Sequence, residues 1–408
     1  MNPKVKMGRL LQALARVCLA LSAACLLAGP AMARAPVTLA TPPVLIGFDG
    51  AYGQKTNTAP MAIELGARAA MDEINQSGGV LGGRPLQLVI TDNKGVSARG
   101  KDNFAELAAM KDMVAVLGGK YSPISVEVLP DAHLLKMPLI SVWGSADAIT
   151  DHAYRPSYSF RVSLKDEWGV AAMVRRIATK YKAERACAFL PNTAWGRSAE
   201  NVIQKMSGAY PLSFPLIRWY NWGDQSFVEA YRACTEVKGQ ALLFVGNEKE
   251  AAVLLKDMVH MPAAQRLPVV AHWGTVGGVL HELVGDALDQ VTFDVIQTFT
   301  FIHNPRPGAR RLADWIHQHS GFKTADAIPS PVGAAHAYDA VHLLALAINQ
   351  AKSTNPAKVR DALEHLPPYS GAVRDYKPAF TSKRHDALSE KQLLFVRLTS
   401  QGVLFPVP

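Results

Sequence analysis

The side chains of this 408-residue chain that are suited to chemistry are hydroxyl, amide, acidic and aromatic groups that follow predicted strands. They are Tyr52, Tyr121, Ser122, Trp143, Ser145, Trp195, Asn247, Glu248 and Trp273. A serine at a helix N-terminus offers its hydroxyl, free backbone N–H groups and the helix dipole to an anion. Aromatic rings add flat apolar walls. This combination is typical of a binding site for a small organic molecule.

The motifs of common catalytic and metal sites are missing from the sequence. It contains no G-x-S-x-G, H-E-x-x-H or P-loop pattern. His317 and His319 fall on a polar helical face, and Ser122 has no evident base to activate its hydroxyl. We therefore expect a protein that is not an enzyme and that uses no metal and no cofactor. A secreted hydrolase is the distant alternative.

Each candidate residue also has a purely structural interpretation. Ser122 can act only as a helix N-cap, and Ser145 can simply start a helix. Trp195 can be an ordinary core residue, and Tyr52 can belong to a loop that contacts no ligand. Glu248 can be a solvated acid that favours the first turn of its helix. The sequence alone leaves both interpretations open.

From residue 43 onward, short apolar runs alternate with longer amphipathic segments. The predicted strands are 44–48, 86–90, 114–117, 138–142, 158–162, 185–190, 212–218, 241–245, 269–271, 291–296, 371–376 and 392–398. The predicted helices are 60–76, 97–111, 122–136, 165–181, 195–206, 225–237, 248–260, 309–319, 332–351 and 356–366. Such alternation predicts βαβ units, parallel sheets and right-handed crossovers.

The alternation starts again after the helix at 165–181, which predicts an α/β protein with two doubly wound parallel-sheet lobes. We place 42–162 and 300–366 in an N-terminal lobe, and 163–299 and 367–408 in a C-terminal lobe. Ligands of open parallel sheets bind beyond the carboxyl ends of the strands. The candidate residues are therefore expected to face one cleft between the lobes.

Four motifs, in their order along the chain, resemble those of the type I periplasmic binding proteins of the leucine/isoleucine/valine-binding branch. They are 74–83 (INQSGGVLGG), 118–123 (GGKYSP), 138–141 (PLIS) and Trp195-Gly196. The glycines of the first motif follow a helix rather than a strand, so a dinucleotide-binding fingerprint is excluded. The resemblance covers nearly all of the chain after residue 42. It implies two lobes joined by three hinge crossings and a monomer that closes on a small-molecule solute.

The resemblance also implies a function and roles for some residues. Proteins of this family are the solute receptors of ABC importers and contact the permease subunits transiently. Ser122 corresponds to a serine that binds the carboxylate of the solute, and Ser145 to a hydroxyl residue near its amino group. Trp143 would offer its backbone and its ring, and Trp195 would cover the solute from the second lobe. A ligand-binding sensory or regulatory protein of the same fold, not coupled to transport, is the alternative.

One position departs from the family pattern. Amino-acid binders of the family pair the ligand ammonium with an acid on the second lobe, whereas the corresponding residue in this chain is Trp273. Asn247 or Glu248, at the neighbouring strand end, can supply a substitute. Among amino acids, amides and aromatic or aliphatic carboxylates, we expect a solute with an anionic or amide-like end rather than a zwitterionic amino acid, because burial of an unpaired ammonium is costly.

Residues 1–33 are typical of a secretory signal peptide. Four basic side chains precede the apolar stretch 17–29, and Ala31-Met32-Ala33 fits a signal-peptidase site. A lipid anchor at Cys25 is the weaker alternative. Removal of the segment lowers the net charge from +9 to +5, and no run of Lys and Arg follows. We therefore expect a periplasmic protein with no nucleic-acid partner.

Two cysteines, Cys187 and Cys234, lie beyond this segment. In an oxidising compartment they can form a disulfide, and in their apolar surroundings they can equally be two small buried side chains. The sequence does not supply the geometry that would distinguish the two.

Overall fold

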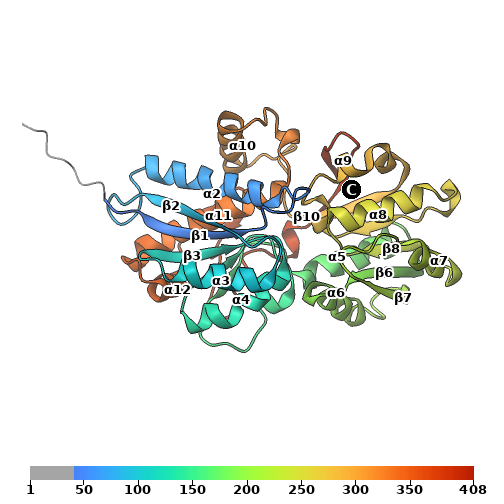
Figure 1. The fold of residues 1–408 in the computed structure, drawn as a ribbon, viewed down its shortest axis with the longest axis horizontal. Coiled ribbons are helices and arrows are strands. Elements are labelled where there is room, and N and C mark those ends of the chain that lie inside the picture. Colours follow the sequence, from blue (N-terminus) through green and yellow to red (C-terminus); the bar gives the residue numbers. More distant parts are fainter. Residues whose placement is uncertain (1–40) are drawn as a thin grey trace, which may run out of the picture. The chain divides into compact units, whose positions relative to one another are not determined.

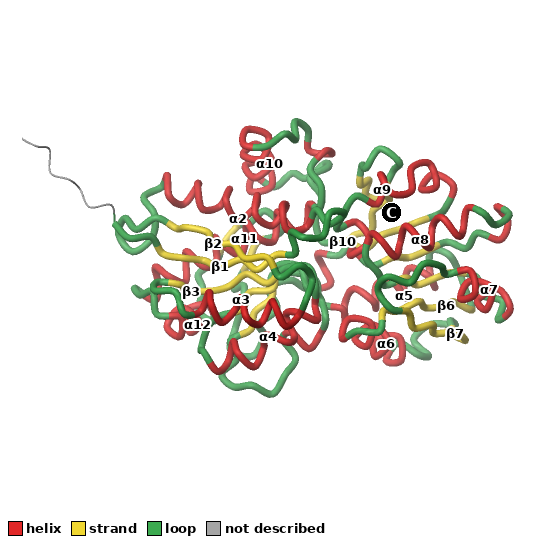
Figure 2. Tube along the Cα trace, in the orientation of Figure 1, coloured by secondary structure: helices red, strands yellow, loops and turns green. Residues whose placement is uncertain are grey.

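The computed structural model describes residues 41–408, of which residues 42–408 form one compact unit (Figure 1). The predicted signal peptide, with cleavage after Ala33 and the alternative anchor at Cys25, lies outside the described residues. Residues 42–408 build two α/β lobes around two mainly parallel sheets. Figure 2 shows the strands of each lobe in yellow with red helices beside them. The predicted fold class is confirmed.

Lobe 1 contains a five-stranded parallel sheet in the order β2-β1-β3-β4-β5. Its strands are β1 (Val44–Gly50), β2 (Leu86–Asp92), β3 (Met113–Gly118), β4 (Leu139–Ser141) and β5 (Ser159–Arg161). Strand β3 is buried at every position, as expected of a central strand that is covered on both faces. The carboxyl ends of β3 and β4 therefore lie next to each other at one edge of the sheet.

Helices cover both faces of this sheet (Figure 1). They are α2 (Ala59–Gln76), α3 (Ser97–Ala108), α4 (Ser122–Leu134), α11 (Pro331–Ala351) and α12 (Pro356–Leu363). A further helix, α10 (Pro307–His319), packs on α2 and α11 rather than on the sheet. Helix α11 returns from far along the sequence and packs against α2. Gly66 of α2 permits this contact, because an added Cβ would lie 2.0 Å from the carbonyl oxygen of Ala334.

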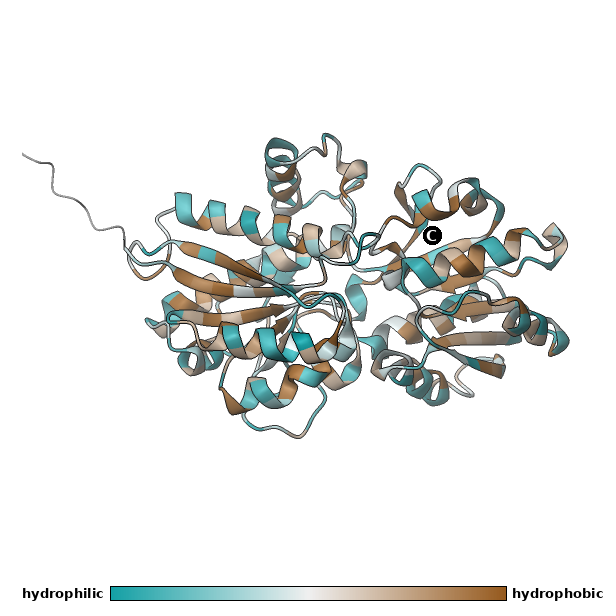
Figure 3. Ribbon diagram, viewed as in Figure 1, coloured by the Kyte–Doolittle hydropathy of each residue, from teal (hydrophilic) through white to brown (hydrophobic). Residues whose placement is uncertain are grey.

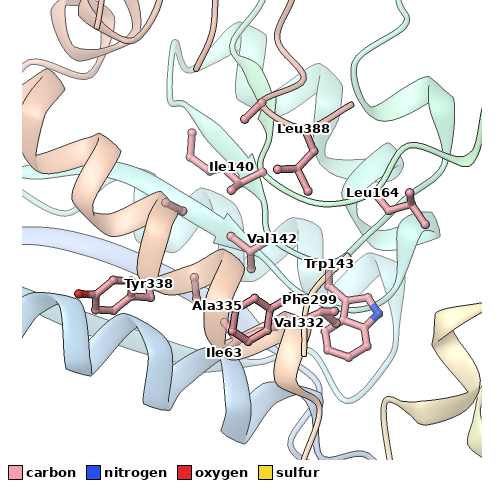
Figure 4. Close-up of a cluster of buried hydrophobic side chains, with 14 of the residues drawn as sticks. Ile63, Ile140, Val142, Trp143, Leu164, Phe299, Val332, Ala335, Tyr338 and Leu388 are labelled. Atoms are coloured by element: carbon pink, nitrogen blue, oxygen red, sulfur yellow. The ribbon is translucent and has the colours of Figure 1, made fainter. Parts of the chain in front are cut away.

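Helix α11 is a core helix. In the part of the chain that the structure describes, it is the one helix long and apolar enough to cross a membrane, but 89% of its apolar window is buried inside the protein. Val332 and Tyr338 of α11 join Ile63 of α2 and Val142 after β4 in a buried hydrophobic cluster (Figure 4). The interior of lobe 1 therefore depends on a helix that lies more than 200 positions after the first strands.

Lobe 2 contains a seven-stranded sheet in the order β14-β13-β10-β9-β8-β6-β7. Its strands are β6 (Arg185–Pro191), β7 (Ser213–Tyr220), β8 (Ala241–Phe244), β9 (Val269–Ala271), β10 (Phe293–Gln297), β13 (Leu394–Leu398) and β14 (Leu404–Val407). Its helices are α5 (Asp166–Thr179), α6 (Ala194–Lys205), α7 (Val228–Glu236), α8 (Glu248–Val259) and α9 (Leu280–Val284). The five parallel strands repeat the order of lobe 1, and β13 and β14 add an antiparallel edge. In both lobes the strands are mostly hydrophobic, whereas hydrophilic residues gather on the helices (Figure 3).

A disulfide joins Cys187 of β6 to Cys234 of α7 inside lobe 2. Both cysteines are fully buried. Gly239 leaves room for the bridge, since an added Cβ would lie 2.4 Å from Sγ of Cys234. Of the two interpretations of these cysteines, the structure confirms the disulfide.

Short elements near the C-terminus differ from the prediction. Residues 371–376 do not form one strand; the two-residue strands β11 (Tyr369–Ser370) and β12 (Asp375–Tyr376) pair with each other instead. Strand β14 and helix α9 are absent from the prediction. These elements are four or five residues long at most, too short for a hydrophobic period to show in the sequence.

The predicted lobe boundary at residue 367 also differs from the contacts. Buried Asp339 of α11 accepts hydrogen bonds from the backbone N–H of Ala372 at 2.6 Å and from the Tyr376 hydroxyl at 2.7 Å. Asp386 pairs with Arg161 of β5 at 2.7 Å. This segment therefore packs on lobe 1, and the chain returns to lobe 2 only with β13. Buried polar groups hold the segment, and they carry no apolar pattern that the sequence could reveal.

Candidate functional site

A small cavity lies between the two lobes, next to the carboxyl ends of β3 and β4 and the starts of α6 and α8. Seven of the nine predicted residues line it: Tyr121, Ser122, Trp143 and Ser145 from lobe 1, and Trp195, Asn247 and Trp273 from lobe 2. Lys120, Trp222 and Gly274 complete the lining. The structure thus brings most of the predicted set together, and the role of these residues in binding stays a prediction.

Ser122 is the first residue of α4, and Tyr121 holds the N-cap position in an extended conformation. The expectation that Ser122 caps the helix is therefore wrong. Its Oγ instead accepts hydrogen bonds from the backbone N–H of Ser145 at 3.1 Å and of Ala146 at 3.2 Å. These bonds tie the turn after β4 to the start of α4. Within residues 41–408 the Ser122 hydroxyl proton has no acceptor of its own, so it remains available to a solute.

The turn that carries Ser145 is held from beneath by a buried ion pair. Arg161 donates to the carbonyl oxygens of Ser145 at 2.7 Å and Ala146 at 3.0 Å, and pairs with Asp386. Burial raises the pKa of Asp386, but the adjacent Arg161 guanidinium outweighs it and holds that pKa below its ordinary value. The pair is therefore charged and fixes the turn. The Ser145 hydroxyl itself makes no hydrogen bond to the described part of the chain.

Three indole rings form the apolar walls of the cavity. The ring centroids of Trp143 and Trp273, from opposite lobes, lie 5.9 Å apart. Trp195 lies over Gly274, where an added Cβ would be 2.6 Å from Trp195 Cη2. Figure 4 shows Trp143 at the edge of the lobe 1 cluster with its indole nitrogen turned away from Phe299. Trp195 is 6% exposed and also packs in the hydrophobic core, so its core interpretation and its place in the cavity wall both apply.

The lining is rich in hydrogen-bond donors and poor in free acceptors. The Trp195 indole N–H is buried and has no partner among residues 41–408. The hydroxyls of Ser122 and Ser145 add two more donors on the opposite side. The Asn247 side chain is engaged in the capping box of α8 with Glu250. In an enclosed apolar setting such donors favour a carboxylate or carbonyl oxygen.

The cavity itself is small and shares part of its lining with a larger vestibule. Its volume of about 10 Å³ is close to that of one water molecule, whereas the vestibule encloses about 420 Å³. Tyr121, Trp222 and Asn247 line both spaces. The rings of Tyr121 and Trp222 lie 5.4 Å apart, so this aromatic pair separates the cavity from the vestibule. A solute larger than water requires these rings or the lobes to move.

Tyr52 does not line the cavity. Its hydroxyl donates to Glu64 at 2.7 Å, and its ring packs edge-on against Phe48. Its backbone N–H donates to Asp92 at 2.9 Å, which holds the turn after β1 on the surface of lobe 1. Tyr52 therefore lies apart from the seven candidate residues that share the cavity.

Glu248 begins α8, as predicted, but it is not a solvated acid. It is 1% exposed, and its carboxylate contacts Lys120 Nζ at 2.5 Å and accepts from the Thr56 hydroxyl at 2.9 Å. Both partners belong to lobe 1. The carboxylate is thus already neutralised, which leaves it no open position for a solute ammonium.

Three lining residues, Lys120, Trp222 and Gly274, were not among the predicted set. Lys120 directly precedes Tyr121 at the carboxyl end of β3, and this position was the signal that could have identified it. Trp222 lies in the loop after β7, where no strand end or helix start marks it.

A further contact between the lobes involves an acid with an altered pKa. The backbone N–H of Asp147, in the turn after Ser145, donates to the Ser198 hydroxyl of α6 at 2.8 Å. Burial, together with the negative charge of Asp166, raises the pKa of Asp147 to about 6. This carboxyl group therefore changes its charge in mildly acidic solution.

Comparisons with known proteins agree with this architecture. A model of the periplasmic binding protein family matches residues 44–402. The leucine-, isoleucine-, valine-, threonine-, and alanine-binding protein of Pseudomonas aeruginosa is 22% identical over 309 residues, 73% of this chain and 76% of that protein. The isoleucine-bound branched-chain amino acid transporter substrate binding protein LivJ of Streptococcus pneumoniae has a TM-score of 0.74 at 20% identity, covering 90% of this chain and 99% of that one. A benzoate-bound solute binding protein from R. palustris has a TM-score of 0.72 at 16% identity, covering 90% and 95%.

Proposed function

Because the chain belongs to the periplasmic binding protein family, we propose that it is an extracytoplasmic receptor that closes its lobes on one small solute and presents it to the permease of an ABC importer. The cavity carries this proposal, since four predicted residues of lobe 1 and three of lobe 2 meet in it. A solute that contacts both lobes stabilises the arrangement in which they are together. The hydroxyl and indole groups that line the cavity donate hydrogen bonds to oxygen atoms but keep their protons at neutral pH. They are therefore suited to binding rather than to catalysis.

The solute that fits best is a small carboxylate or amide with an apolar or aromatic body. Free donors from Ser145 and Trp195 suit its oxygen atoms, and the indole rings suit its body. The nearby carboxylate of Glu248 is occupied by Lys120 and Thr56. A buried ammonium without a partner costs several kcal/mol. A cation–π contact with Trp273 would return only about 0.5–2 kcal/mol.

Amino acids are the second candidate class. The name of the Pseudomonas aeruginosa relative describes binding of five amino acids. Glu248 beside the cavity is the residue that would receive the ammonium if Lys120 moved away. These two observations make the amino-acid alternative worth testing directly.

Calorimetric titration separates the two classes. We expect an aromatic or 2-oxo acid, such as benzoate or phenylpyruvate, to bind with a micromolar Kd, and leucine, valine and phenylalanine to give no heat of binding. Micromolar binding of any of these amino acids, abolished in Glu248→Gln, would replace the carboxylate proposal with the amino-acid one.

Coupling to transport requires a separate experiment. A cell that lacks this protein should lose high-affinity uptake of the labelled solute and regain it when the gene is restored. Unchanged uptake, with loss of a transcriptional or chemotactic response to the solute, would identify the alternative, a sensory or regulatory binding protein of the same fold.

A further inference from the structure

Glu248, an acid of lobe 2 that lines the vestibule, is held by groups from lobe 1. Lys120 Nζ lies 2.5 Å from one carboxylate oxygen of Glu248 and donates to the carbonyl oxygen of Gly277 at 3.1 Å. The other carboxylate oxygen accepts from Thr56 at 2.9 Å. The side chains of Lys120 and Glu248 are 2% and 1% exposed. The pair is therefore buried, and each charge depends on the other.

The ammonium of Lys120 lies beside one of the indole walls of the cavity. Lys120 lines the cavity together with Trp143 and Trp273. A Cβ added to Gly277 would lie 2.8 Å from Lys120 Nζ and 2.8 Å from Trp143 Cζ2, so the ammonium and the indole meet at this glycine. A positive charge from the protein itself thus occupies the place beside the indole walls where a cationic group of a solute would meet Glu248.

Other charges near the site do not duplicate this arrangement. Lys249 donates to Gln54 at 2.9 Å on the exposed side of the vestibule. Glu250 lines the vestibule as Glu248 does, but its carboxylate accepts from the Asn247 backbone N–H at 3.3 Å. Among the described residues that line the cavity, Lys120 is the charged one.

We infer that Lys120 is a specificity-determining residue: it acts as a built-in ammonium that neutralises Glu248 and excludes ammonium-bearing solutes from the cavity. This inference rests on the proposed function, since it takes the cavity as the solute site. A buried carboxylate that loses its partner strongly favours a replacement cation. Removal of the Lys120 side chain creates both the unpaired carboxylate and the space for an amine.

The test is a gain of binding in Lys120→Ala. Titration with leucine, phenylalanine and n-propylamine should show at least tenfold tighter binding to Lys120→Ala than to the unaltered protein. The control, Lys120→Ala with Glu248→Gln, keeps the space but removes the charge, and should lose this gain. A Lys120→Ala variant that folds but binds these amines no more tightly than the control would overturn the inference. Lys120 would then have only a structural role, joining the two lobes through its ion pair with Glu248.

A second variant covers the case in which Lys120→Ala does not fold. In Glu248→Gln the ammonium of Lys120 stays in place without its partner, and binding of benzoate should become at least threefold tighter, with no gain for n-propylamine. Unchanged or weaker benzoate binding would overturn the inference. A different result would contradict the proposed solute class. In that case the unaltered protein, with Lys120 in place, would bind leucine or phenylalanine.

Discussion

The hydroxyl groups of Ser122 and Ser145 face the same cavity, but only one of them also holds the backbone. Ser122 Oγ accepts from two backbone N–H groups of the turn after β4. The Ser145 hydroxyl makes no such bond to residues 41–408. Substitution of each serine therefore separates a contribution to solute binding from a contribution to folding.

We expect Ser145→Ala to weaken benzoate binding by about 1–3 kcal/mol, the cost of one charge-assisted hydrogen bond, with little change in the free energy of unfolding. Ser122→Ala should weaken binding and also lower the free energy of unfolding by about 1–3 kcal/mol, because the N–H groups of Ser145 and Ala146 lose their acceptor. Calorimetric titration and urea unfolding measure the two effects. Equal losses of stability in the two variants would contradict this assignment.

Asp147 gives the protein a pH dependence with a defined sign. Its pKa is about 6 in the folded protein against an ordinary value of 3.8, so the folded state holds this proton more tightly than the unfolded chain. The stability from protonated Asp147 is complete below about pH 4 and is lost as the pH rises toward 6. At pH 7 the buried carboxylate therefore costs stability.

Asp147→Asn should raise the free energy of unfolding by about 1–3 kcal/mol at pH 7, with the gain shrinking toward zero near pH 4. The amide oxygen of the substituted side chain can still accept from the Glu167 backbone N–H, which lies 2.9 Å from Asp147 Oδ1. Burial also raises the pKa of Asp339 to about 6. Asp339 is present in the unaltered protein and in Asp147→Asn, so its contribution cancels when their free energies of unfolding are compared. A gain of equal size at pH 4 and pH 7 would refute the role of charge.

Most of the individual residues that line the cavity could be predicted from the sequence, because residues that follow parallel strands meet at one edge of a sheet. The indole at position 273 and the serine at position 145 were found in this way. Lys120 was missed because a lysine before a helix is usually solvated, and its buried partner Glu248 lies 128 positions later. Tyr52 was placed wrongly because hydrogen bonds to Glu64 and Asp92, rather than its strand, direct it.

Helices α2 and α11 show how element packing depends on single residues. The two helices are in contact at Gly66 and Ala334, where no side chain larger than hydrogen fits on α2. Gly333, which precedes Ala334 in α11, leaves space for the ring of Trp143, since an added Cβ would lie 2.9 Å from Trp143 Cζ3. The same helix pair therefore supports both the core of lobe 1 and one wall of the cavity.

Gly66→Ala should lower the free energy of unfolding by about 1–3 kcal/mol, because the new Cβ would meet the Ala334 carbonyl oxygen and force α11 outward. Gly321→Ala is the matched control, since nothing lies within 4 Å of an added Cβ there. Urea unfolding of both variants measures the effect. A destabilisation in Gly321→Ala as large as in Gly66→Ala would mean that the helix contact is not its cause.

Elements with a clear hydrophobic period were predicted to within a few residues of their ends, as for α2 and α8. Elements that depend on specific strand pairing or hydrogen bonds were not predicted. Strand β14 contains Pro406, which argues against a strand in the sequence but is tolerated at the edge of a sheet beside β13. Strands β11 and β12 depend on buried Asp339, a contact that no local pattern encodes.

At the level of the whole molecule, backbone hydrogen bonds as well as an ion pair join the two lobes. Val279 N–H donates to the Thr56 carbonyl oxygen at 3.0 Å, and Thr58 N–H to that of Gly277 at 3.2 Å. These bonds lie beside the Lys120–Glu248 pair. A solute bound in the cavity adds its own contacts to both lobes, so its binding should raise the stability of the protein as a unit.

A solute at one hundred times its Kd should raise the free energy of unfolding by about 2.7 kcal/mol, and in a variant with tenfold weaker binding, such as Ser145→Ala, by about 1.4 kcal/mol at the same concentration. Thermal shift with benzoate measures both. The same shift in the two proteins would show that the solute binds outside this cavity.

The buried acid of α11 also bears on the export that the proposed extracytoplasmic function requires. Asp339 lies near the middle of this 21-residue apolar helix, with His336 beside it. An aspartate at the centre of a helix costs about 2.5–3.5 kcal/mol on transfer into a bilayer. The Asp339 side chain, which accepts hydrogen bonds from Ala372 and Tyr376 in the folded lobe, would therefore also disfavour insertion of α11 into lipid in an exported chain.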